Sequence, residues 1–291
     1  MKQAALTTGL TPSDVKRYLA RLGVPAPAAP TAAVLGDLLR AHVRRVPFEN
    51  LLIQLNRPAT LRTTVTAARI ARGGGGYCFE LNGAFGALLA AVGFEVLRHE
   101  GRVWIGDPEP PDVFVNHLAL TVRCVDGSWW FAEVGMSDAI CEPIPLEPGR
   151  YSQGPFDYRL EAITGPVGPG WRFHHDPRGS FGGMDFSLVP ARMQIIEDAH
   201  RRLSTDPESP FTRLLSVGRR DLSGADILRG RVLIRWDSAG RTNRCYDDVD
   251  EWFALLATDL GLPVGDLGPA DREALWGRVC AGHGAWQASQ R

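Results

Sequence analysis

Apolar side chains return at helical spacing through the first third of the chain. The pair Thr11-Pro12 supplies an N-cap and a first-turn proline, and Gly23 is placed to end the helix that they begin. A second helix is predicted over residues 31–45, where apolar positions recur every three or four residues. The same reasoning predicts one helix that ends at Arg72 and another that runs from Cys78 to the stop signal Gly93.

The middle of the chain changes to short runs rich in β-branched and aromatic residues, which are typical of strands. Strands are predicted over residues 111–122 and 128–135, and Asp126-Gly127 between them is a hairpin signal. Residues 141–190 are rich in proline, glycine and aromatic side chains and predict a loop-rich β region. The last predicted elements are a helix over 193–204, a strand over 229–237, a helix over 247–260 and a frayed end over 282–291. The pattern favours an α+β fold.

The composition narrows the class of protein. The chain has 291 residues with a formal net charge of −1, so it lacks the basic excess of a typical nucleic-acid binder. No apolar run is long enough to span a bilayer, and residues 1–23 contain no uninterrupted apolar segment of the signal-peptide kind. The five cysteines include no CxxC pair, which argues against a disulfide framework or a zinc ribbon. We expect a cytoplasmic protein with reduced thiols, no metal, and neither nucleic-acid nor membrane partners.

Residues 72–83, RGGGGYCFELNG, carry the first candidate for chemistry. Cys78 follows four glycines and begins a predicted helix, where backbone N–H groups and the helix dipole stabilise a thiolate and can hold an oxyanion. The glycines are expected to keep the space above the sulfur clear, so that valine at Gly75 or Gly76 would slow acylation with the fold largely intact. A phosphate-binding loop is disfavoured because no lysine follows the glycines. The alternative is a small buried residue without a catalytic role.

A cysteine nucleophile needs a base, and the base needs an acceptor that orients it. His117 lies within a predicted strand, and Glu133 lies in the next strand among apolar residues. A two-residue turn between the strands would place the two side chains on opposite faces of the sheet, whereas an odd-length loop or a bulge would place them on the same face. A structural histidine and a salt-bridged glutamate remain alternatives, and Asp138 is a rival acid.

The other histidines give weaker evidence for a catalytic or metal-binding role. His174 and His175 are adjacent on an irregular segment without the spacing of metal ligands, so a packing or solvated role is preferred. His42 lies on a predicted helix among polar residues and is expected to be exposed.

Four motifs resemble those of the arylamine N-acetyltransferases. The segment RGGGGYCFELNGAF is similar to the family's active-site pattern Arg-Gly-Gly-x-Cys-x-Glu-x-Asn, and VPFENLLIQLNRP, NHLAL and STDPESPFT resemble three further family segments in the same order. The resemblance implies a helical domain over residues 1–93, a β-barrel domain over 94–190, and a linking helix with an α/β lid over 191–291. It also implies a core related to that of papain and the transglutaminases.

The resemblance implies ping-pong acyl transfer from acetyl-CoA, or another acyl thioester, to an arylamine or hydrazine, with no tightly bound cofactor. Carried over by position, Cys78 is the nucleophile, His117 the base and Glu133 the orienting carboxylate. Glu49 and Arg72 match charged motif positions and are expected to pair and brace the Cys78 loop, unless Glu49 lies at the surface. The residues expected to bind substrate are Phe48, Tyr77, Phe114, Met136 and Phe211.

Departures from the family pattern at four positions keep other functions open. Glu133 replaces an aspartate, Met136 replaces a phenylalanine, and Ser137 and Asp138 replace glycines of a loop that approaches CoA in many members. One alternative is an amide synthase that transfers a polyketide chain from an acyl carrier protein to an amine. Another is a cysteine hydrolase or amidase that uses the same residues with water as the acceptor. A third is a catalytically inactive binding protein.

Overall fold

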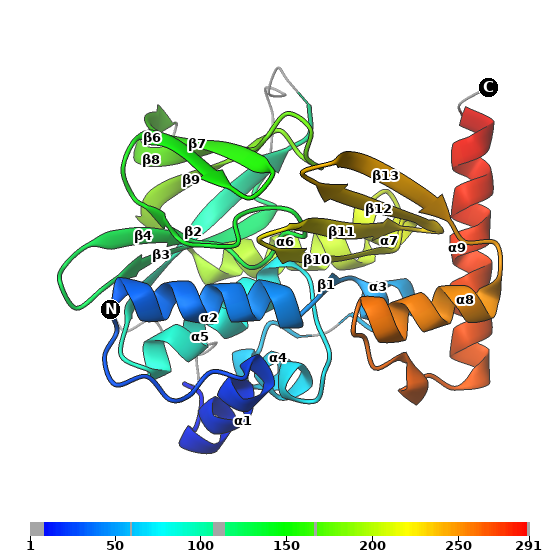
Figure 1. Cartoon of the computed structure of the whole chain (residues 1–291), viewed down its shortest axis with the longest axis horizontal. Helices are drawn as coiled ribbons and strands as arrows, with labels where there is room; N and C mark the ends of the chain where they lie inside the picture. The colour runs from blue at the N-terminus through cyan, green and yellow to red at the C-terminus, as the bar shows by residue number, and fades with distance from the viewer. Residues whose placement is uncertain (1–8, 59, 107–113, 166–167, 290–291) are drawn as a thin grey trace.

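The first third of the chain is helical, as predicted (Figure 1). The computed structural model describes residues 9–58, 60–106, 114–165 and 168–289. The Thr11 side chain caps the first helix by accepting from the Asp14 backbone N–H, and Gly23 ends it in the left-handed conformation with φ 64°. The helices of this region are α1 (Pro12–Leu22), α2 (Ala32–Arg45), α3 (Leu51–Gln54), α4 (Thr63–Ala71) and α5 (Cys78–Ala91).

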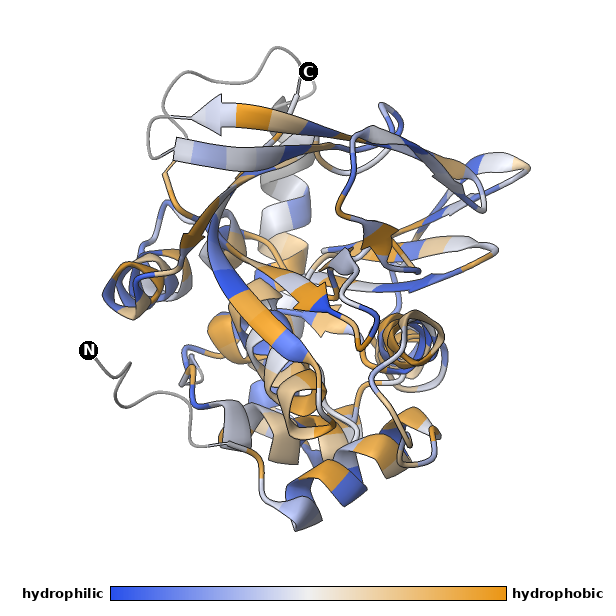
Figure 2. Ribbon diagram, turned by 90° about the vertical axis from the view of Figure 1, so that its left-hand side faces the viewer, coloured by the Kyte–Doolittle hydropathy of each residue, from blue (hydrophilic) through white to orange (hydrophobic). Residues whose placement is uncertain are grey.

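Helix α5 lies in the middle of the protein. Every residue from Cys78 to Leu89 is buried, because the helix is apolar on all sides and packs between α4 and the strands behind it. Figure 2 shows apolar ribbon gathered where the helices meet the sheets, with hydrophilic segments at outer turns. The predicted nucleophile is therefore the first residue of a core helix, in a setting that positions it rigidly.

An antiparallel eight-stranded sheet forms the second region. Its order is β5-β4-β3-β2-β9-β8-β7-β6, and its two edge strands, β5 and β6, follow one another in the sequence with only residues 146–148 between them. Such a short link requires the two edges to lie close together, so the sheet curls into a nearly closed barrel (Figure 1). The strands are β2 (Glu95–Trp104), β3 (His117–Arg123), β4 (Trp129–Ala132), β5 (Ile144–Pro145), β6 (Gly149–Gln153), β7 (Phe156–Gly165), β8 (Gly168–His174) and β9 (Gly183–Pro190).

The predicted hairpin is present but shorter than the sequence indicated. Strand β3 begins only at His117, and β4 ends at Ala132, one residue before Glu133. The first residues of the strand predicted over 111–122 lie outside the described part of the chain. Cys124 and Ser128 close the hairpin by a backbone hydrogen bond of 2.9 Å, which leaves a three-residue loop over 125–127. The odd-length alternative is therefore the one adopted.

A five-stranded sheet, β1-β10-β11-β12-β13, holds the last third together. Its edge strand β1 (Phe48–Glu49) comes from the helical region, so the two regions share one hydrogen-bonded sheet. The single strand predicted over 229–237 is in fact the end of one strand and the whole of the next, separated by a turn at Gly230 with φ 57°. The other strands are β10 (Ser216–Asp221), β11 (Gly224–Arg229), β12 (Val232–Asp237) and β13 (Gly240–Cys245).

The helices of the last third are α6 (Met193–Thr205), α7 (Pro210–Arg213), α8 (Val249–Ala254), the π-helical turn Leu255–Asp259, the 3-10 turn Val264–Asp266 and α9 (Pro269–Ser289). The predicted helix over 193–204 is confirmed. The prediction of a frayed end over 282–291 is wrong for its described residues, because α9 continues to Ser289. Within the described ranges, no helix combines the length and apolarity needed to cross a membrane.

Candidate active site

Cys78 is the first residue of α5, with Tyr77 as the N-cap. The glycine loop that precedes it is pinned to β1: Phe48 and Gly76 form a parallel bridge, and the Glu49 N–H donates to the Gly76 carbonyl at 2.8 Å. The Cys78 side chain is almost wholly buried, with its sulfur 3.7 Å from the Asn116 carbonyl oxygen. The sequence therefore placed the thiol correctly at a helix N-terminus.

The glycines before Cys78 serve close backbone packing, which corrects the expectation that they clear space above the sulfur. A Cβ at Gly75 would overlap the carbonyl oxygen of Pro47, and a Cβ at Gly76 would come within 2.8 Å of the Arg69 guanidinium. Neither contact lies toward the thiol. The glycine that approaches Cys78 is Gly135, where an added Cβ would lie 2.7 Å from the Cys78 Cα.

The brace on this loop is Arg69, and the prediction for Arg72 is wrong. The Arg69 guanidinium donates to the Gly75 carbonyl at 2.9 Å and to Glu80 Oε1 at 2.6 Å. Arg72 is exposed and forms no ion pair within the described ranges, because it follows the last turn of α4 and points outward. Glu49 is buried, as a bracing residue should be, and burial raises its pKa while the charge of Arg69 opposes that shift.

His117 and Glu133 meet in the core. With the three-residue loop, Leu120 faces Ala132 across the ladder, so residues of equal parity share a face and the two side chains lie on the same side. His117 Nε2 is 2.7 Å from Glu133 Oε2, and both side chains are at most 2% exposed. Burial alone would lower the pKa of His117, but the charges and hydrogen bonds of Glu133 and Cys78 outweigh it and raise that pKa to about 10.

Asn82, one turn along α5 from Cys78, links this pair to the helix that begins at Cys78. Its amide nitrogen donates to Glu133 Oε1 at 2.8 Å and to the Leu118 carbonyl at 2.8 Å, and its oxygen accepts from the Val134 N–H at 3.0 Å. Glu133 Oε1 also accepts from the Gly135 N–H, so both carboxylate oxygens have donors. The sequence analysis assigned no role to Asn82 or Glu80, although the family motif specifies the residue type at both positions.

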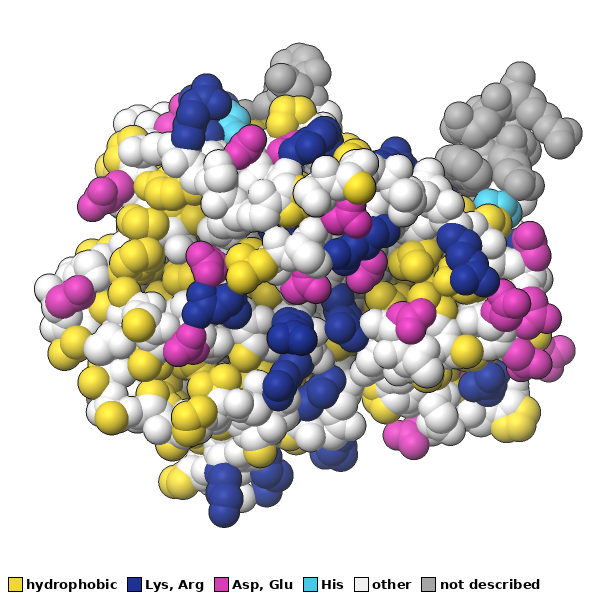
Figure 3. Space-filling model, in the orientation of Figure 1, with side chains coloured by type: hydrophobic (Ala, Val, Ile, Leu, Met, Phe, Trp, Pro, Cys, Tyr) yellow, Lys and Arg dark blue, Asp and Glu magenta, His cyan; other side chains and the backbone are white. Residues whose placement is uncertain are grey.

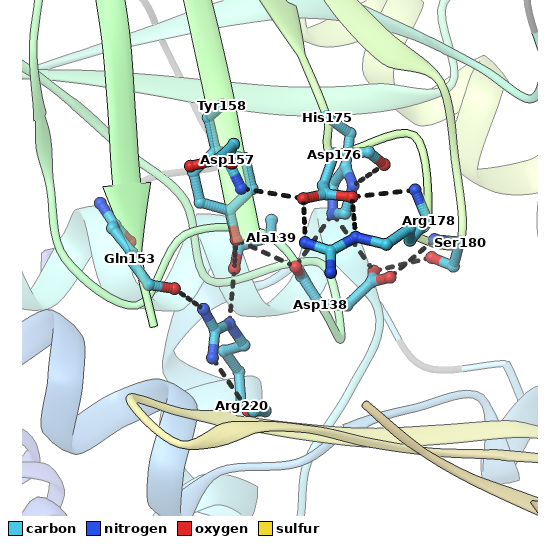
Figure 4. Close-up of polar contacts among 11 residues, drawn as sticks. Asp138, Ala139, Gln153, Asp157, Tyr158, His175, Asp176, Arg178, Ser180 and Arg220 are labelled. Atoms are coloured by element: carbon cyan, nitrogen blue, oxygen red, sulfur yellow. Dashed lines mark hydrogen bonds and ion pairs between the residues drawn. The ribbon is translucent and has the colours of Figure 1, made fainter. Parts of the chain in front are cut away.

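The carboxylate of Asp138, the rival acid, is hydrogen-bonded to Ser180 of the barrel, whereas the carboxylate that contacts His117 is that of Glu133 (Figure 4). Its carboxylate accepts from the N–H and the hydroxyl of Ser180, each at 2.7 Å, and its backbone carbonyl contacts His175 Nε2 at 2.9 Å. The Asp138 side chain is wholly buried. It therefore anchors the loop after Glu133 to the barrel, and it presents no negative charge at the surface.

Arg220 of β10 is hydrogen-bonded to the same loop from the five-stranded sheet (Figure 4). The buried guanidinium donates to the Ala139 carbonyl at 3.0 Å and to the Gln153 carbonyl at 2.7 Å, and it lies 4.7 Å from the centre of the Phe156 ring. Its other donors meet carbonyls of its own hairpin. A buried cation is thus satisfied by carbonyl oxygens, and it links the five-stranded sheet to the loop that carries Glu133.

Three of the five residues expected to bind substrate lie together beside Cys78. The rings of Tyr77 and Phe211 meet edge to face with centroids 5.4 Å apart, and the Phe48 ring lies 6.4 Å from that of Phe211. The Tyr77 hydroxyl is hydrogen-bonded to His200 Nδ1 of α6. Met136 lies with Phe48 in a narrow cleft against Gly218 and Arg219.

Phe114 stands apart from this group. Its ring is 38% exposed and is covered by the Arg202 guanidinium at 4.0 Å.

The other histidines serve packing. The prediction that His42 is exposed is wrong: it is fully buried, with Nε2 2.8 Å from the Tyr18 hydroxyl, and burial followed by the charge of Arg21 lowers its pKa to about 3. His174 contacts Glu161 at 2.7 Å, and His175 is buried against Phe181. Among the residues that the structure describes, no three His, Cys, Asp or Glu side chains group as a metal site would require.

Helix α5 and the β3–β4 hairpin bring together a buried thiol, an imidazole and a carboxylate. Comparison of the chain with known proteins identifies its family. A family model described as N-acetyltransferase matches residues 31–267. An arylamine N-acetyltransferase of Mycolicibacterium smegmatis is 30% identical over 90% of this chain and 96% of its own. The chain belongs to the arylamine N-acetyltransferase family.

Two further relatives differ in the activity that their names give. The solved structure of the Mycobacterium marinum arylamine N-acetyltransferase in complex with CoA superposes with a TM-score of 0.82 at 27% identity, over 91% of this chain and 98% of that one. The proansamycin X synthase of Amycolatopsis mediterranei is 27% identical over 84% of this chain and 95% of its own. Relatives whose names give different activities are thus similar to this chain at the same level of sequence identity.

Proposed function

We propose that this chain transfers an acetyl group from acetyl-CoA to an arylamine or hydrazine through an acyl-enzyme on Cys78. The observation that carries the proposal is the contact of His117 Nε2 with Glu133 Oε2 at 2.7 Å, beside a thiol at a helix N-terminus. A nucleophile, a base and a group that orients the base are the three parts that acyl transfer through cysteine needs. The family to which the chain belongs supports the same reaction.

The raised pKa of His117 favours an imidazolium next to the sulfur at neutral pH. In the first half-reaction the Cys78 thiolate attacks the thioester carbonyl carbon, and the free N–H groups at the start of α5 face the developing oxyanion. The bond from that carbon to the CoA sulfur breaks, and His117 gives its proton to the CoA thiolate. The products are acetyl-Cys78, neutral His117 and free CoA.

In the second half-reaction the amine nitrogen attacks the acetyl carbon, and neutral His117 takes the proton that the nitrogen loses. The carbon–sulfur bond to Cys78 breaks, which restores the thiolate and the imidazolium. Glu133 stabilises the positive charge on His117 in both halves. The aromatic group of Phe48, Tyr77 and Phe211 supplies a wall for the ring of the acceptor, with Met136 as a flexible neighbour.

The test is intact-protein mass spectrometry after mixing with acetyl-CoA, with Cys78→Ala as the control. We expect the wild type to gain one acetyl group, the variant to gain none, and added arylamine to discharge the acyl-enzyme with formation of the acetylated amine. Acetylation of the wild type and the variant to the same extent would overturn the assignment of Cys78. An acyl-enzyme that water discharges as fast as amines would favour the hydrolase or amidase.

A second candidate is transfer of a longer acyl chain from an acyl carrier protein, which the similarity to proansamycin X synthase favours. The departures from the family pattern at Met136 and Ser137 line the narrow cleft beside Phe48, so they can change which acyl donor that cleft accepts. Longer acyl thioesters in the same mass-spectrometry experiment separate the two functions. Acylation by these donors, together with refusal of acetyl-CoA, would replace the acetyltransferase proposal with this one.

A further inference from the structure

Strand β10 links the two halves of the candidate active site, which are the thiol at the start of α5 and the histidine–glutamate pair of the hairpin. Gly218 of β10 faces Phe48 of β1 across an antiparallel ladder, and Phe48 forms the parallel bridge to Gly76. Gly76 lies two residues before Cys78 in the chain. One short strand, β1, therefore connects β10 to the loop that carries the thiol.

One face of β10 lies against the loop that follows Glu133. A Cβ added at Gly218 would lie 2.2 Å from the Ser137 Cβ, and the Arg220 guanidinium donates to the Ala139 carbonyl at 3.0 Å. Positions 218 and 220 point to the same face of the sheet, because side chains alternate along a strand. Two alternate positions of β10 thus meet two alternate positions of the loop.

Arg220 carries a buried charge without a carboxylate partner among the described residues. It is 2% exposed, unlike the basic side chains that Figure 3 shows gathered at the surface over the C-terminal half of α2. Its donors meet the carbonyl oxygens of Ala139, Gln153 and Gly224. A buried charge is a poor source of net stability, because its lost hydration offsets the contacts that it gains. The rigid, planar set of donors instead fixes three carbonyls relative to one another.

The barrel holds the same loop independently of β10 (Figure 4). The Tyr158 hydroxyl donates to the Ala139 carbonyl at 2.9 Å, and the Gln153 side-chain oxygen accepts from the Cys141 N–H at 2.8 Å. The Ala139 carbonyl is therefore the point at which the barrel and β10 meet. Loss of the Arg220 donor would leave the loop tied to the barrel and detached from the strand that reaches the thiol.

We propose that β10 sets the distance between the two halves of the active site, and that Arg220 is the positioning residue through which it does so. Arg220 holds the Ala139 carbonyl, and the loop in turn keeps the Glu133 carboxylate in place. Glu133 then stays against His117 while β1 holds the loop before Cys78. The inference rests on the proposed function for the roles of these residues, so its first test requires no acetyl transfer.

The first test is an NMR titration of His117 in the wild type, in Arg220→Lys and in two control variants. Lysine keeps the positive charge but offers a point charge in place of the planar fork, so it does not reach all three carbonyls at once. Burial lowers the pKa of His117, and Glu133 and Cys78 raise it above its usual value. We therefore expect His117 to bind its proton about tenfold more weakly in Arg220→Lys, where Glu133 is no longer held in place.

The controls separate a local effect from general destabilisation. Leu19→Ala opens a cavity under the buried face of α1. Arg235→Lys makes the same substitution in the same five-stranded sheet, in an ion pair with Asp226. We expect both controls to titrate like the wild type. An equal shift in Leu19→Ala would overturn the proposal, and so would an unchanged His117 in a folded Arg220→Lys.

The second readout is stopped-flow acylation of Cys78 by acetyl-CoA. Misplacement of a catalytic group by about 1 Å typically costs on the order of 100-fold in rate, so the maximal rate should fall about 10- to 100-fold in Arg220→Lys. The half-saturating donor concentration should change less than the rate, and the opposite pattern would assign Arg220 to substrate binding and overturn the positioning role. A His117 shift in the variant, with a wild type that takes no acetyl group, would keep the positioning role and reject the proposed function.

A second set of substitutions tests β10 with Arg220 in place. Gly218→Ala puts a methyl group 2.2 Å from the Ser137 Cβ, so it should displace the loop and weaken proton binding by His117. Adding Ser137→Gly removes that neighbour, and the remaining contact of 3.2 Å with the Asp226 carbonyl oxygen requires only a small shift. The double variant should therefore recover the titration of the wild type.

This second set decides the question if Arg220→Lys does not fold. Wild-type titration of His117 in Gly218→Ala would overturn the proposal. A shift in Gly218→Ala that Ser137→Gly fails to reverse would also overturn it, because the contact between β10 and the loop would not be its cause.

Discussion

The side-chain amide of Asn82 donates to Oε1 of Glu133 at 2.8 Å, while Oε2 of the same carboxylate faces His117. A residue on the helix of the proposed nucleophile thus fixes the carboxylate that faces the proposed base. The acid follows the end of β4 rather than lying within it, and the loop after it is held by Asp138 from the barrel and by Arg220 from the five-stranded sheet. The position of Glu133 therefore depends on all three regions of the chain.

Replacement of Glu133 by Gln should lower the pKa of His117 and slow acylation of Cys78. The amide keeps the shape of the side chain but removes the negative charge that stabilises the imidazolium. We expect kcat/KM to fall by roughly 10²–10⁴, the usual contribution of an oriented acid–base pair. NMR titration of His117 and stopped-flow acylation measure the two effects. Asp138→Asn is the control, and a larger drop in the His117 pKa in that variant would assign the role to Asp138.

The stability of the protein should fall at alkaline pH through His117. Its pKa is raised from the ordinary value of 6.5 to about 10, so the folded state holds this proton more tightly than the unfolded state. The resulting stabilisation is fully present below about pH 6.5 and is lost as the pH rises through about 10. Urea unfolding at pH 6.5 and pH 10 should show a larger loss for the wild type than for His117→Gln, and parallel losses would contradict the prediction.

Arg69→Gln and Arg72→Gln form a matched pair. Loss of Arg69 leaves the carboxylates of Glu80 and Glu49 buried without their cation, which typically costs about 3–5 kcal/mol of unfolding free energy. Loss of the exposed Arg72 should change that free energy by less than about 0.5 kcal/mol. Urea denaturation of both variants measures the difference. Equal effects of the two substitutions would show that Arg69 is not the brace.

Gly75→Ala should destabilise the fold rather than merely slow the reaction. The new methyl group would overlap the Pro47 carbonyl oxygen, in a segment held by backbone pairing with β1, and overpacking of this kind costs about 1–3 kcal/mol. Gly277→Ala on α9 is the control, because nothing lies within 4 Å of its added Cβ and alanine favours the helix. Thermal unfolding measures both, and an unchanged melting temperature for Gly75→Ala would restore the sequence-based expectation.

Local signals in the sequence identified most of the helices of the first third and the position of Cys78. The Thr11-Pro12 and Gly23 signals marked the first helix correctly, and the placement of Cys78 at a helix start needed only the residues around it. The family resemblance supplied His117 and Glu133, which local patterns alone left open. The length of the hairpin loop decides whether these two side chains share a face of the sheet. Asp126-Gly127 is compatible with a loop of two residues or of three, and the structure has three.

The predictions that failed depend on contacts between distant parts of the chain. His42 was expected at the surface because its helical neighbours are polar, but its partner Tyr18 lies on another helix. The brace was assigned to Arg72 by motif position, whereas Arg69, one turn earlier, is the residue that reaches Glu80. The shape of the sheet that joins β1 to β10 likewise depends on a pairing that no local pattern encodes.

The pairing of β1 with β10 also sets the order in which parts of the site form during synthesis. A chain that has emerged past Ile140 already contains Cys78, His117 and Glu133, but β1 still lacks its neighbour β10, and Phe48 lacks Phe211. Because folding on the ribosome proceeds from the N-terminus, Cys78, His117 and Glu133 are present before the aromatic wall that we propose to contact the acceptor. Completion of the last third is therefore the moment at which that wall can form beside the proposed nucleophile.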